Sequence, residues 1–296
     1  MHRSASPRTR RVGRGLALGV ITLLVGLAAA PAARASQAAT TPPRAMWVWS
    51  FADAAGTVDF ATTHGIQQLF VAVPPNVTTS PDLPRLKALA GGARAAGLLV
   101  DALGGDPGWI DNQQWVVDRW LKPAIATGLF TGIHVDIEPY TTPAWGTDQA
   151  GVVSRYLATL TTLRKAAGTR PLEADIPFWF NQVAAGPGST LDREIMKRTA
   201  AVTLMAYRNT AAGPDGTLDI AAPEMAAAAS LGVPARIGQE TNNLGTDPAA
   251  SKQTFAGMTV SQMQSQLTGV DNGAAAWGTY AGIAIHDYAG FRAMAP

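Results

Sequence analysis

Three side chains capable of acid–base chemistry alternate with apolar residues between positions 131 and 140. His134, Asp136 and Glu138 are separated by valine and isoleucine, and Pro139 ends the run. Period-two alternation is typical of a β-strand whose two faces have different surroundings. Asp136 and Glu138 would then lie on one face, about 6–7 Å apart along the strand. Two carboxyls placed in this way can provide one group that donates a proton and one that stays negatively charged.

This strand is one of eight apolar runs that recur along the chain at fairly regular spacing. The runs lie near residues 46, 68, 98, 132, 171, 201, 235 and 282. Helical stretches lie between them. Strand–helix alternation repeated eight times predicts an α/β fold, the (β/α)8 or TIM barrel.

Three of the expected helices have apolar faces, and two of these have recognisable ends. We expect Ser80 and Pro81 to begin one helix and Gly97 to end it, and Thr147 to cap another that Gly168 ends. An alanine-rich helix is expected near residues 221–230. The apolar faces are formed in the first helix by Leu83, Leu86 and Leu89, in the second by Val153, Tyr156, Leu160 and Leu163, and in a third by Val260, Met263 and Leu267.

The barrel fold predicts which strand face points inward. The outer face packs on helices, so the apolar face should point outward and the polar face inward. Glu138 is then nearest the C-terminal mouth of the barrel, where the active sites of this fold lie. Because barrel interiors are normally filled by branched apolar side chains, a polar interior near the mouth predicts a functional site. The same alternation places inside the barrel Asp101, Glu173, Asp175, Tyr207, Glu240 and His286.

Three motifs in chain order resemble glycoside hydrolase family 18, the chitinase family. The family carries S-x-G-G on strand three, D-G-x-D-x-D-x-E on strand four and M-x-Y-D on strand six. Here residues 102–105 read A-L-G-G, residues 131–138 read T-G-I-H-V-D-I-E and residues 205–208 read M-A-Y-R. The resemblance implies that Glu138 is the general acid and Asp136 its partner. It also implies that Asp136 and Tyr207 orient an acetamido group of the substrate, which attacks the anomeric carbon.

The sequence departs from the family pattern at several of these positions. Thr131 and His134 replace two aspartates of the strand-four motif, and Arg208 replaces the aspartate of M-x-Y-D. His286 lies near where a strand-eight tryptophan is common in the family. The residues that would handle the acetamido group are therefore altered.

A second pattern indicates a different catalytic pair. The segments I-E-P at 137–139 and Q-E-T at 239–241 resemble those around the acid/base and the nucleophile of the clan-A retaining glycosidases. Glu138 would then be the acid/base and Glu240 the nucleophile, with carboxyl groups about 5–5.5 Å apart. Ile137 stands where that clan usually has an asparagine.

Further residues are candidates for binding a sugar. Sugars expose apolar C–H faces that stack on indole rings, so tryptophans at strand ends are candidate platforms. Asp101 and Asp175 could contact substrate or support the site, whereas Glu173 lies deeper and is expected to be structural. The predicted substrate-binding residues are Trp49, Asp101, Asp175, Trp179, Trp277 and His286.

The N-terminal residues predict export. A basic start, an apolar stretch from Leu16 to Ala30 and a small-x-small segment at 33–35 together predict a signal peptide over residues 1–35, cleaved after Ala35. Residues 36–44 are expected to form a flexible Thr/Pro-rich leader, and residues 45–296 a single barrel domain. The mature protein should be secreted, free of the membrane after cleavage, and monomeric.

Charge and cysteine content exclude several classes of function. Six of the 23 Lys and Arg residues and none of the 21 Asp and Glu residues lie in residues 1–35, so the remainder carries 17 basic and 21 acidic residues, a net charge of −4. Nucleic-acid binding is not expected, because it needs a basic patch on the folded domain. The chain has no cysteine, which excludes disulfides and thiolate metal sites.

Histidines near the acids raise the question of a metal. His134 and His286 could join Asp136 and Glu138 as ligands, but neutral histidines that hydrogen-bond to the acids are the simpler expectation. No metal or other cofactor is therefore predicted.

These patterns together predict a glycosidase that acts on a polysaccharide or glycan. The predicted catalytic residues are Glu138, Asp136, Tyr207 and Glu240. Two other interpretations stay open, namely a carbohydrate-binding barrel without turnover and a metal-dependent hydrolase.

Overall fold

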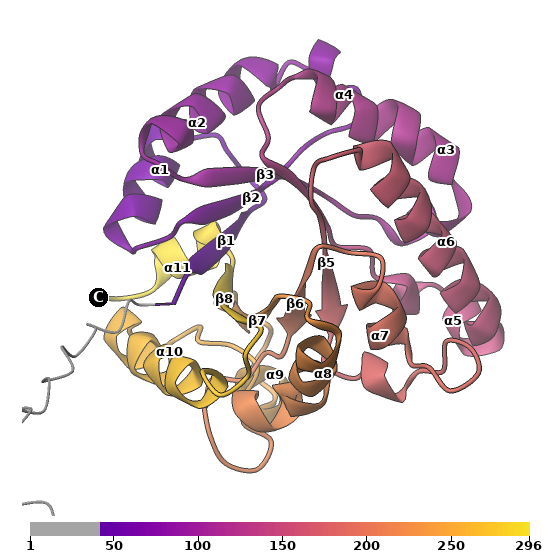
Figure 1. Ribbon diagram of the computed structural model, residues 1–296. Coiled ribbons are helices and arrows are strands. Elements are labelled where there is room, and N and C mark those ends of the chain that lie inside the picture. Colours follow the sequence, from indigo (N-terminus) through magenta and orange to yellow (C-terminus); the bar gives the residue numbers. More distant parts are fainter. Residues whose placement is uncertain (1–41) are drawn as a thin grey trace, which may run out of the picture. The chain divides into compact units, whose positions relative to one another are not determined.

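The computed structural model describes residues 42–296, and the predicted signal peptide lies outside the described residues. The described part contains eight strands that pair in chain order, all parallel, into a closed barrel (Figure 1). The predicted (β/α)8 barrel is therefore confirmed. The strands are β1 (Arg44–Val48), β2 (Gln68–Ala72), β3 (Leu99–Gly104), β4 (Gly132–Val135), β5 (Leu172–Pro177), β6 (Ala201–Met205), β7 (Ala235–Glu240) and β8 (Tyr280–His286).

Helices surround the barrel as an outer ring (Figure 1). In the described chain, no helix combines the length and the hydrophobicity needed to cross a membrane. The main helices of the ring are α1 (Ala54–Thr63), α2 (Leu83–Ala95), α4 (Lys122–Ala126), α6 (Gln149–Ala167), α7 (Leu191–Met196), α8 (Thr217–Leu231), α10 (Val260–Ala274) and α11 (Tyr288–Ala293). Short segments in the connections are η1 (Val77–Thr79), η2 (Pro107–Asp111), α3 (Gln113–Val116), η3 (Val117–Leu121), η4 (Pro139–Thr141), α5 (Ala144–Thr147), η5 (Phe180–Gln182) and α9 (Pro248–Ser251).

Two helix starts differ from those predicted. Helix α2 begins at Leu83, after Asp82, and not at Ser80. Helix α6 is capped by Asp148 rather than Thr147, because an Asp148 carboxylate oxygen accepts a hydrogen bond from the backbone N–H of Gly151 at 3.1 Å. The negative charge of a carboxylate also interacts favourably with the positive end of the helix dipole, whereas an uncharged hydroxyl provides only the hydrogen bond.

The barrel begins one residue earlier than predicted. Arg44, which the sequence placed in the leader, is the first residue of β1 and is buried. Its Nη1 donates to Asp271 Oδ1 of α10 at 3.0 Å. This charge-assisted pair connects the start of β1 to α10. It stabilises Arg44 in the strand rather than in the leader.

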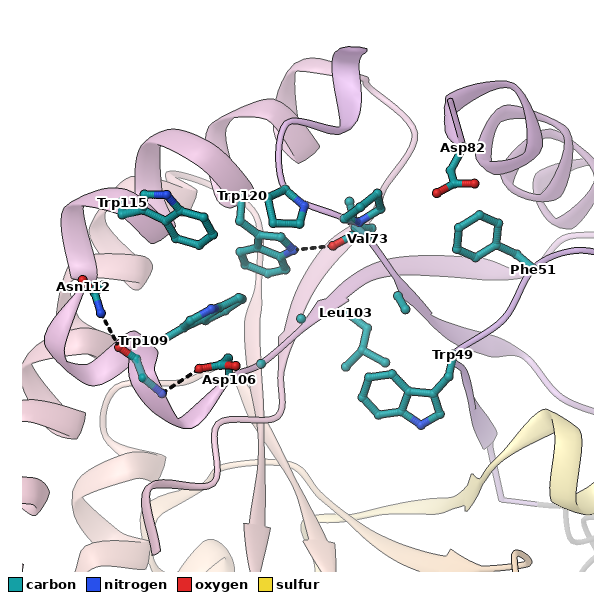
Figure 2. Close-up of a pocket in the computed structure, with 16 residues that line it drawn as sticks. Trp49, Phe51, Val73, Asp82, Leu103, Asp106, Trp109, Asn112, Trp115 and Trp120 are labelled. Atoms are coloured by element: carbon teal, nitrogen blue, oxygen red, sulfur yellow. Dashed lines mark hydrogen bonds between the residues drawn. The ribbon is translucent and has the colours of Figure 1, made fainter. Parts of the chain in front are cut away.

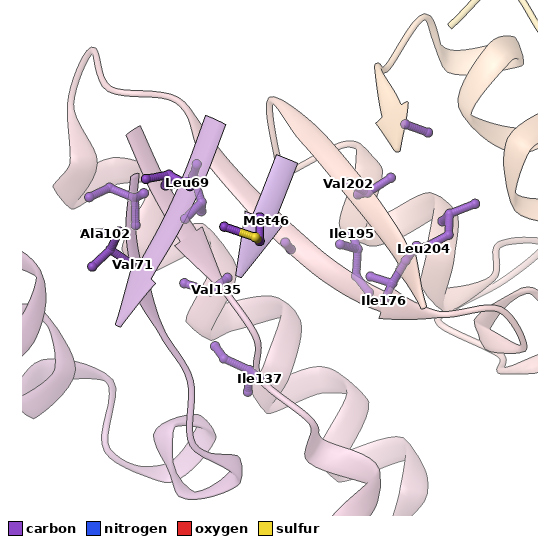
Figure 3. Packing of buried hydrophobic residues seen from close by; sticks show 14 of the residues in the cluster. Met46, Leu69, Val71, Ala102, Val135, Ile137, Ile176, Ile195, Val202 and Leu204 are labelled. Atoms are coloured by element: carbon purple, nitrogen blue, oxygen red, sulfur yellow. The ribbon is translucent and has the colours of Figure 1, made fainter. Parts of the chain in front are cut away.

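The strands separate two apolar layers. Side chains on the outer strand faces pack against helices, as Figure 3 shows for Met46, Leu69, Val135 and Ile176. A smaller cluster fills part of the interior and consists of Ala45, Trp47, Phe70, Leu103 and Ala284. The rest of the interior is polar. Successive strand side chains thus point alternately inward and outward, as the sequence predicts.

Two glycines at the end of β3 let β4 approach closely. The Gly104 carbonyl accepts a hydrogen bond from the Asp136 N–H at 3.0 Å. A Cβ at Gly105 would lie 1.7 Å from the Asp136 carbonyl oxygen, and a Cβ at Gly104 would lie 2.5 Å from the Trp120 ring. Gly105 is therefore explained by packing against the main chain of the strand-four motif, and Gly104 by packing against the Trp120 ring.

Substitution of Gly105 should therefore displace Asp136. We expect Gly105→Ala to lower the free energy of unfolding by about 1–3 kcal/mol, because the methyl group cannot fit without moving a backbone segment. The matched control is Gly91→Ala on the exposed side of α2, where an added Cβ meets nothing within 4 Å. That change should be neutral or stabilise by up to about 1 kcal/mol. Urea unfolding followed by circular dichroism measures both, and equal stabilities of the two variants would contradict this account.

Candidate active site

The lower part of the barrel interior holds a closed polar network. Arg236 Nη1 donates to Glu173 Oε2, and its Nη2 donates to Gln68 Oε1, both at 2.7 Å. Gln68 donates to Asp101, and Thr131 Oγ1 donates to Asp101 Oδ1 at 2.7 Å. Asp101 is buried, and both its oxygens are engaged. It supports the barrel floor, which is one of the two roles predicted for it. Glu173 is structural, as expected from its depth.

A buried histidine lies above this floor. His134 is fully buried, and its Nε2 hydrogen-bonds to Asp175 Oδ1 at 2.8 Å. Burial opposes a charge on the ring, but the carboxylates of Asp175 and Glu173 outweigh it and raise the pKa of His134 to about 9. Trp47 Nε1 donates to the other Asp175 oxygen at 3.1 Å. Asp175 is thus buried beneath the mouth with both carboxylate oxygens hydrogen-bonded.

Asp136 and Glu138 lie just past the end of β4, which is shorter than the sequence predicts. Both side chains are half-buried, and Tyr140 Oη donates to Glu138 Oε1. Asp136 Oδ1 is buried with no hydrogen-bond partner. Burial first, and then the charges of Asp175 and Glu138, raise the pKa of Asp136 well above its usual range. Asp136 therefore holds its proton more strongly than an ordinary carboxyl does.

Tyr207 lies two residues beyond the end of β6, among the carboxyls of the mouth. Burial raises its pKa well above the usual value, and the nearby charges of Asp175, Glu240, Asp136 and Glu138 raise it further. The ring lies against β7, because a Cβ on Gly238 would be 3.1 Å from Tyr207 Cε1. The glycine of β7 thus leaves the space that the tyrosine occupies.

Glu240 is buried at the end of β7 and fully hydrogen-bonded. Its Oε1 accepts from the backbone N–H groups of Thr241 at 2.8 Å and Asn242 at 2.7 Å, and from Asn242 Nδ2 at 3.0 Å. Its Oε2 pairs with His286 Nδ1 at 2.7 Å. Burial opposes a charge on His286, but Glu240 outweighs it and raises the pKa of the ring. Trp49 Nε1 donates to the other ring nitrogen of His286 at 2.9 Å.

A groove of about 730 Å³ runs beside these residues over the C-terminal ends of β1 to β3. Figure 2 shows Trp49 and Trp115 on opposite sides of it, with Trp109 and Asp106 between them. The two outer indoles are 39% and 46% exposed, which leaves their faces open to a ligand. The lining includes the carboxylates of Asp82 and Asp106 but no basic side chain. Trp49, which also contacts His286, connects the groove to the acid cluster.

Sequence reasoning missed two of these tryptophans. Trp109 and Trp115 follow the strand-three glycines in the segment D-P-G-W-I-D-N-Q-Q-W at 106–115. The signal was available, because several tryptophans crowd the connection that follows a strand at the mouth of a barrel.

The other predicted tryptophans have different surroundings. Trp179 belongs to an aromatic cluster with Tyr140, Trp145 and Phe180, and its ring centroid lies 5.2 Å from that of Tyr140. It therefore packs against the residue that holds Glu138. Trp277 precedes β8, at the opposite end of the barrel from the mouth. Trp277 therefore lies away from the acids of the mouth, and its role in substrate binding stays a prediction.

Arg208 does not take over the role of the aspartate that it replaces. Its Nη2 pairs with Asp215 Oδ1 at 2.6 Å, and its guanidinium lies 5.3 Å from the centroid of the Phe178 ring. Arg208 is thus committed to the connection between β6 and α8. Within residues 42–296, no three His, Asp or Glu side chains are arranged to hold a metal ion.

Comparison with known proteins bears on the fold. No sequence family matches the chain, and no curated protein is detectably similar to it. Among solved structures, a class V chitinase from Pseudomonas fluorescens Pf-5 aligns with 85% of this chain and 97% of its own, at 13% identity and a TM-score of 0.54. A GH18 chitinase from Flavobacterium johnsoniae aligns with 84% of this chain and 89% of its own, at 16% identity and a TM-score of 0.52. The chain has a distant family-18-like fold. The predicted resemblance is confirmed at the level of the fold.

The buried His134 should make stability depend on pH. Its folded pKa of about 9 lies above the ordinary value of 6.5, so its contribution is complete below about pH 6.5 and is lost as pH rises through 9. We expect His134→Gln to cost about 3–5 kcal/mol near pH 6, since it leaves a buried carboxylate unpaired, and clearly less above pH 9. Thermal unfolding of both proteins from pH 5 to 10 measures the difference. A difference that stays constant over this range would contradict a charged His134.

Proposed function

We propose that this protein is a glycoside hydrolase that cleaves glycosidic bonds of a polysaccharide or glycan, with Glu138 as the general acid. The observation that carries the proposal is the pair of half-buried carboxyls, Asp136 and Glu138, that follows β4 at the mouth of the barrel. Glycoside cleavage needs a protonated carboxyl beside the leaving oxygen and negative charge facing an oxocarbenium-like centre. The mouth offers several carboxyls for these roles, because Asp136 lies close to Glu138 and Asp175, and Tyr207 lies among Asp136, Glu138, Asp175 and Glu240.

Glu138 is well placed to deliver this proton. Tyr140 donates a hydrogen bond to it, and the cluster around Trp179 fixes the Tyr140 ring. The groove beside it can bind the sugars that flank the cleaved bond, since the indoles of Trp49 and Trp115 can stack on their C–H faces. A glycan that lies along this groove would pass from Trp115 to Trp49 and on to the acids.

The roles of the other predicted catalytic residues follow from their contacts. The donors around Glu240 leave it little capacity to attack a substrate carbon, which argues against a role as nucleophile. Asp136 and Tyr207 flank the place where a sugar would bind, as substrate-assisted hydrolysis requires. Arg208, however, supplies no carboxylate there.

Substitution of Glu138 tests the proposal. We expect Glu138→Gln to reduce kcat by about 10²–10⁴-fold, because the amide cannot donate a proton to the leaving group. Asp136→Asn should reduce it as well, since it removes the partner that keeps the proton in the pair. The substrates are N-acetylchitohexaose, cellohexaose, laminarihexaose and xylohexaose, with release of shorter sugars followed by chromatography.

The matched control is Asp59→Asn, which makes the same carboxylate-to-amide change on the exposed side of α1. It should retain wild-type turnover. A Glu138→Gln protein that keeps full turnover would end the proposal.

A second function is favoured by one observation. The residues that replace family aspartates are engaged in ion pairs, with His134 bound to Asp175 and Arg208 bound to Asp215. A barrel altered in this way could bind carbohydrate without cleaving it. Binding of one of the four oligosaccharides without turnover at any pH from 4 to 8 would support this second function against the first.

We further propose that the protein is secreted as a monomer after cleavage following Ala35. The basic start and apolar stretch of residues 1–35 support this proposal. Intact-mass analysis of the exported protein should give a chain that begins at Ser36. A chain that retains residues 1–35 and sediments with membranes would contradict it.

A further inference from the structure

We propose that the groove beside the acids binds amino sugars whose amines are free and positively charged, so that the substrate is a partly deacetylated amino-sugar polymer. The groove is the cavity of about 730 Å³ over the C-terminal ends of β1 to β3. This inference names the substrate class of the proposed function and rests on that function for cleavage, whereas the binding preference can be measured without turnover.

The walls of the groove are aromatic. Trp49 and Trp115 lie on opposite sides of it, and Trp109 lies between them (Figure 2). Trp109 and Trp120 pack together with ring centroids 4.7 Å apart, and Trp120 Nε1 donates to the Val73 carbonyl at 3.0 Å, so these two rings are held in place. Indole faces stack on the C–H faces of sugars, and among aromatic rings indole also attracts a cation most strongly. A sugar that carries an ammonium group can use both interactions.

The charge of the groove is negative. Within residues 42–296, the side chains that line it include the carboxylates of Asp82 and Asp106 but no lysine, arginine or histidine. Asp106 is exposed, and its Oδ1 accepts a hydrogen bond from the Gly108 N–H at 2.7 Å, which fixes the carboxylate at the start of η2. Asp82 Oδ1 lies 3.5 Å from Arg85 Nη1, so the charge of Asp82 is partly compensated. Asp106 is therefore the principal partner for an ammonium group in the groove.

The sign of this charge separates three classes of glycan. A uronic acid polymer would bring further carboxylates next to Asp82 and Asp106, with no basic side chain of the groove to pair with them. A neutral glucan can stack on the indoles but leaves the charge of both carboxylates uncompensated. A glycan with ammonium groups stacks in the same way and also pairs with the carboxylates. The groove therefore favours a cationic glycan over an anionic or a neutral one.

The sugar at the acids differs from those in the groove. In the proposed function, Asp136 and Tyr207 flank the place of an acetamido group, which carries no charge. Trp49, whose Nε1 donates to His286 at 2.9 Å, lies where the groove meets the acids. A chain fits both parts if one sugar keeps its acetyl group and the neighbouring sugars have lost theirs. The proposed polymer is thus partly, and not fully, deacetylated.

Three hexasaccharides that differ only in the substituent beside the anomeric carbon test the preference. Hexaglucosamine carries an ammonium group there, N-acetylchitohexaose an acetamido group and cellohexaose a hydroxyl group. Calorimetric titration of the Glu138→Gln protein, which should leave the ligands intact, measures the three affinities. At about pH 5.5, where amines are protonated, we expect hexaglucosamine to bind about tenfold more tightly than the other two.

Salt provides the electrostatic control for this measurement. Sodium chloride at about 0.5 M should remove most of the preference, because it screens the charges of exposed groups. Equal or weaker binding of hexaglucosamine at low salt, or no binding of any of the three ligands, would overturn the proposal.

Substitution of Asp106 separates charge from packing. Asp106→Asn should weaken the binding of hexaglucosamine by about three- to tenfold and leave that of cellohexaose unchanged, because the amide has the same size and its oxygen can still accept from the Gly108 N–H. Trp115→Ala should weaken all three ligands, since it removes a stacking surface. The matched control is Asp59→Asn on α1, outside the groove, which should change none of the affinities. An Asp106→Asn protein that keeps the full preference would contradict the proposal.

The products of cleavage connect this preference with the proposed function. The wild-type protein is incubated with partly deacetylated chitin oligosaccharides, and the products are sequenced by mass spectrometry. We expect N-acetyl groups at the new reducing ends and free amines enriched at neighbouring positions relative to the starting material. Preferential binding without turnover would remove the proposed function and leave the assignment of the groove standing. Turnover without enrichment of free amines would overturn the assignment of the groove and leave the proposed function standing.

Discussion

The charge balance inside the barrel depends on His134. Its imidazole lies between the carboxylates of Asp175 and Glu173 in a space that barrels normally fill with branched apolar side chains. Together with Arg236 it compensates for the acids below the mouth. Without this compensation the buried carboxylates would take up protons or repel one another. Either outcome would lower the free energy of unfolding by several kcal/mol. A positively charged histidine below thus lets a cluster of acids exist above.

The mouth of the barrel divides its acids into two kinds by their hydrogen bonds. Glu240 is surrounded by hydrogen-bond donors and pairs with His286, so both its oxygens are committed to neighbours. Asp136 has a buried oxygen without a partner and lies close to other carboxyls, so its pKa rises.

The fold is shared with chitinases, whereas the chemistry at the mouth is rearranged. The strand-three glycines and the two carboxyls after β4 occupy the positions that the family motifs give them, and Gly105 is needed for backbone packing alone. Arg208, by contrast, pairs with Asp215, which an aspartate could not do, and His286 joins Glu240 and Trp49 through its two ring nitrogens, which an indole with one N–H could not do. Function depends on the site more than on the barrel. The rearranged side chains are therefore a better guide to this protein than its structural neighbours.

The sequence alone determined the eight strands and the inward direction of Asp136 and Glu138, because period-two alternation and an apolar layer beneath helices leave one choice of face. The position of Trp277 before its strand could also have placed that residue at the end of the barrel opposite the mouth. Only the tertiary structure decided which polar side chains meet. Alternation gives the face of a residue but not its height in the barrel, which depends on the stagger between strands. Asp101 therefore lies in the barrel floor, whereas Glu240 reaches His286 at the mouth. The shape of the groove depends on how the connection after β3 folds back over the mouth.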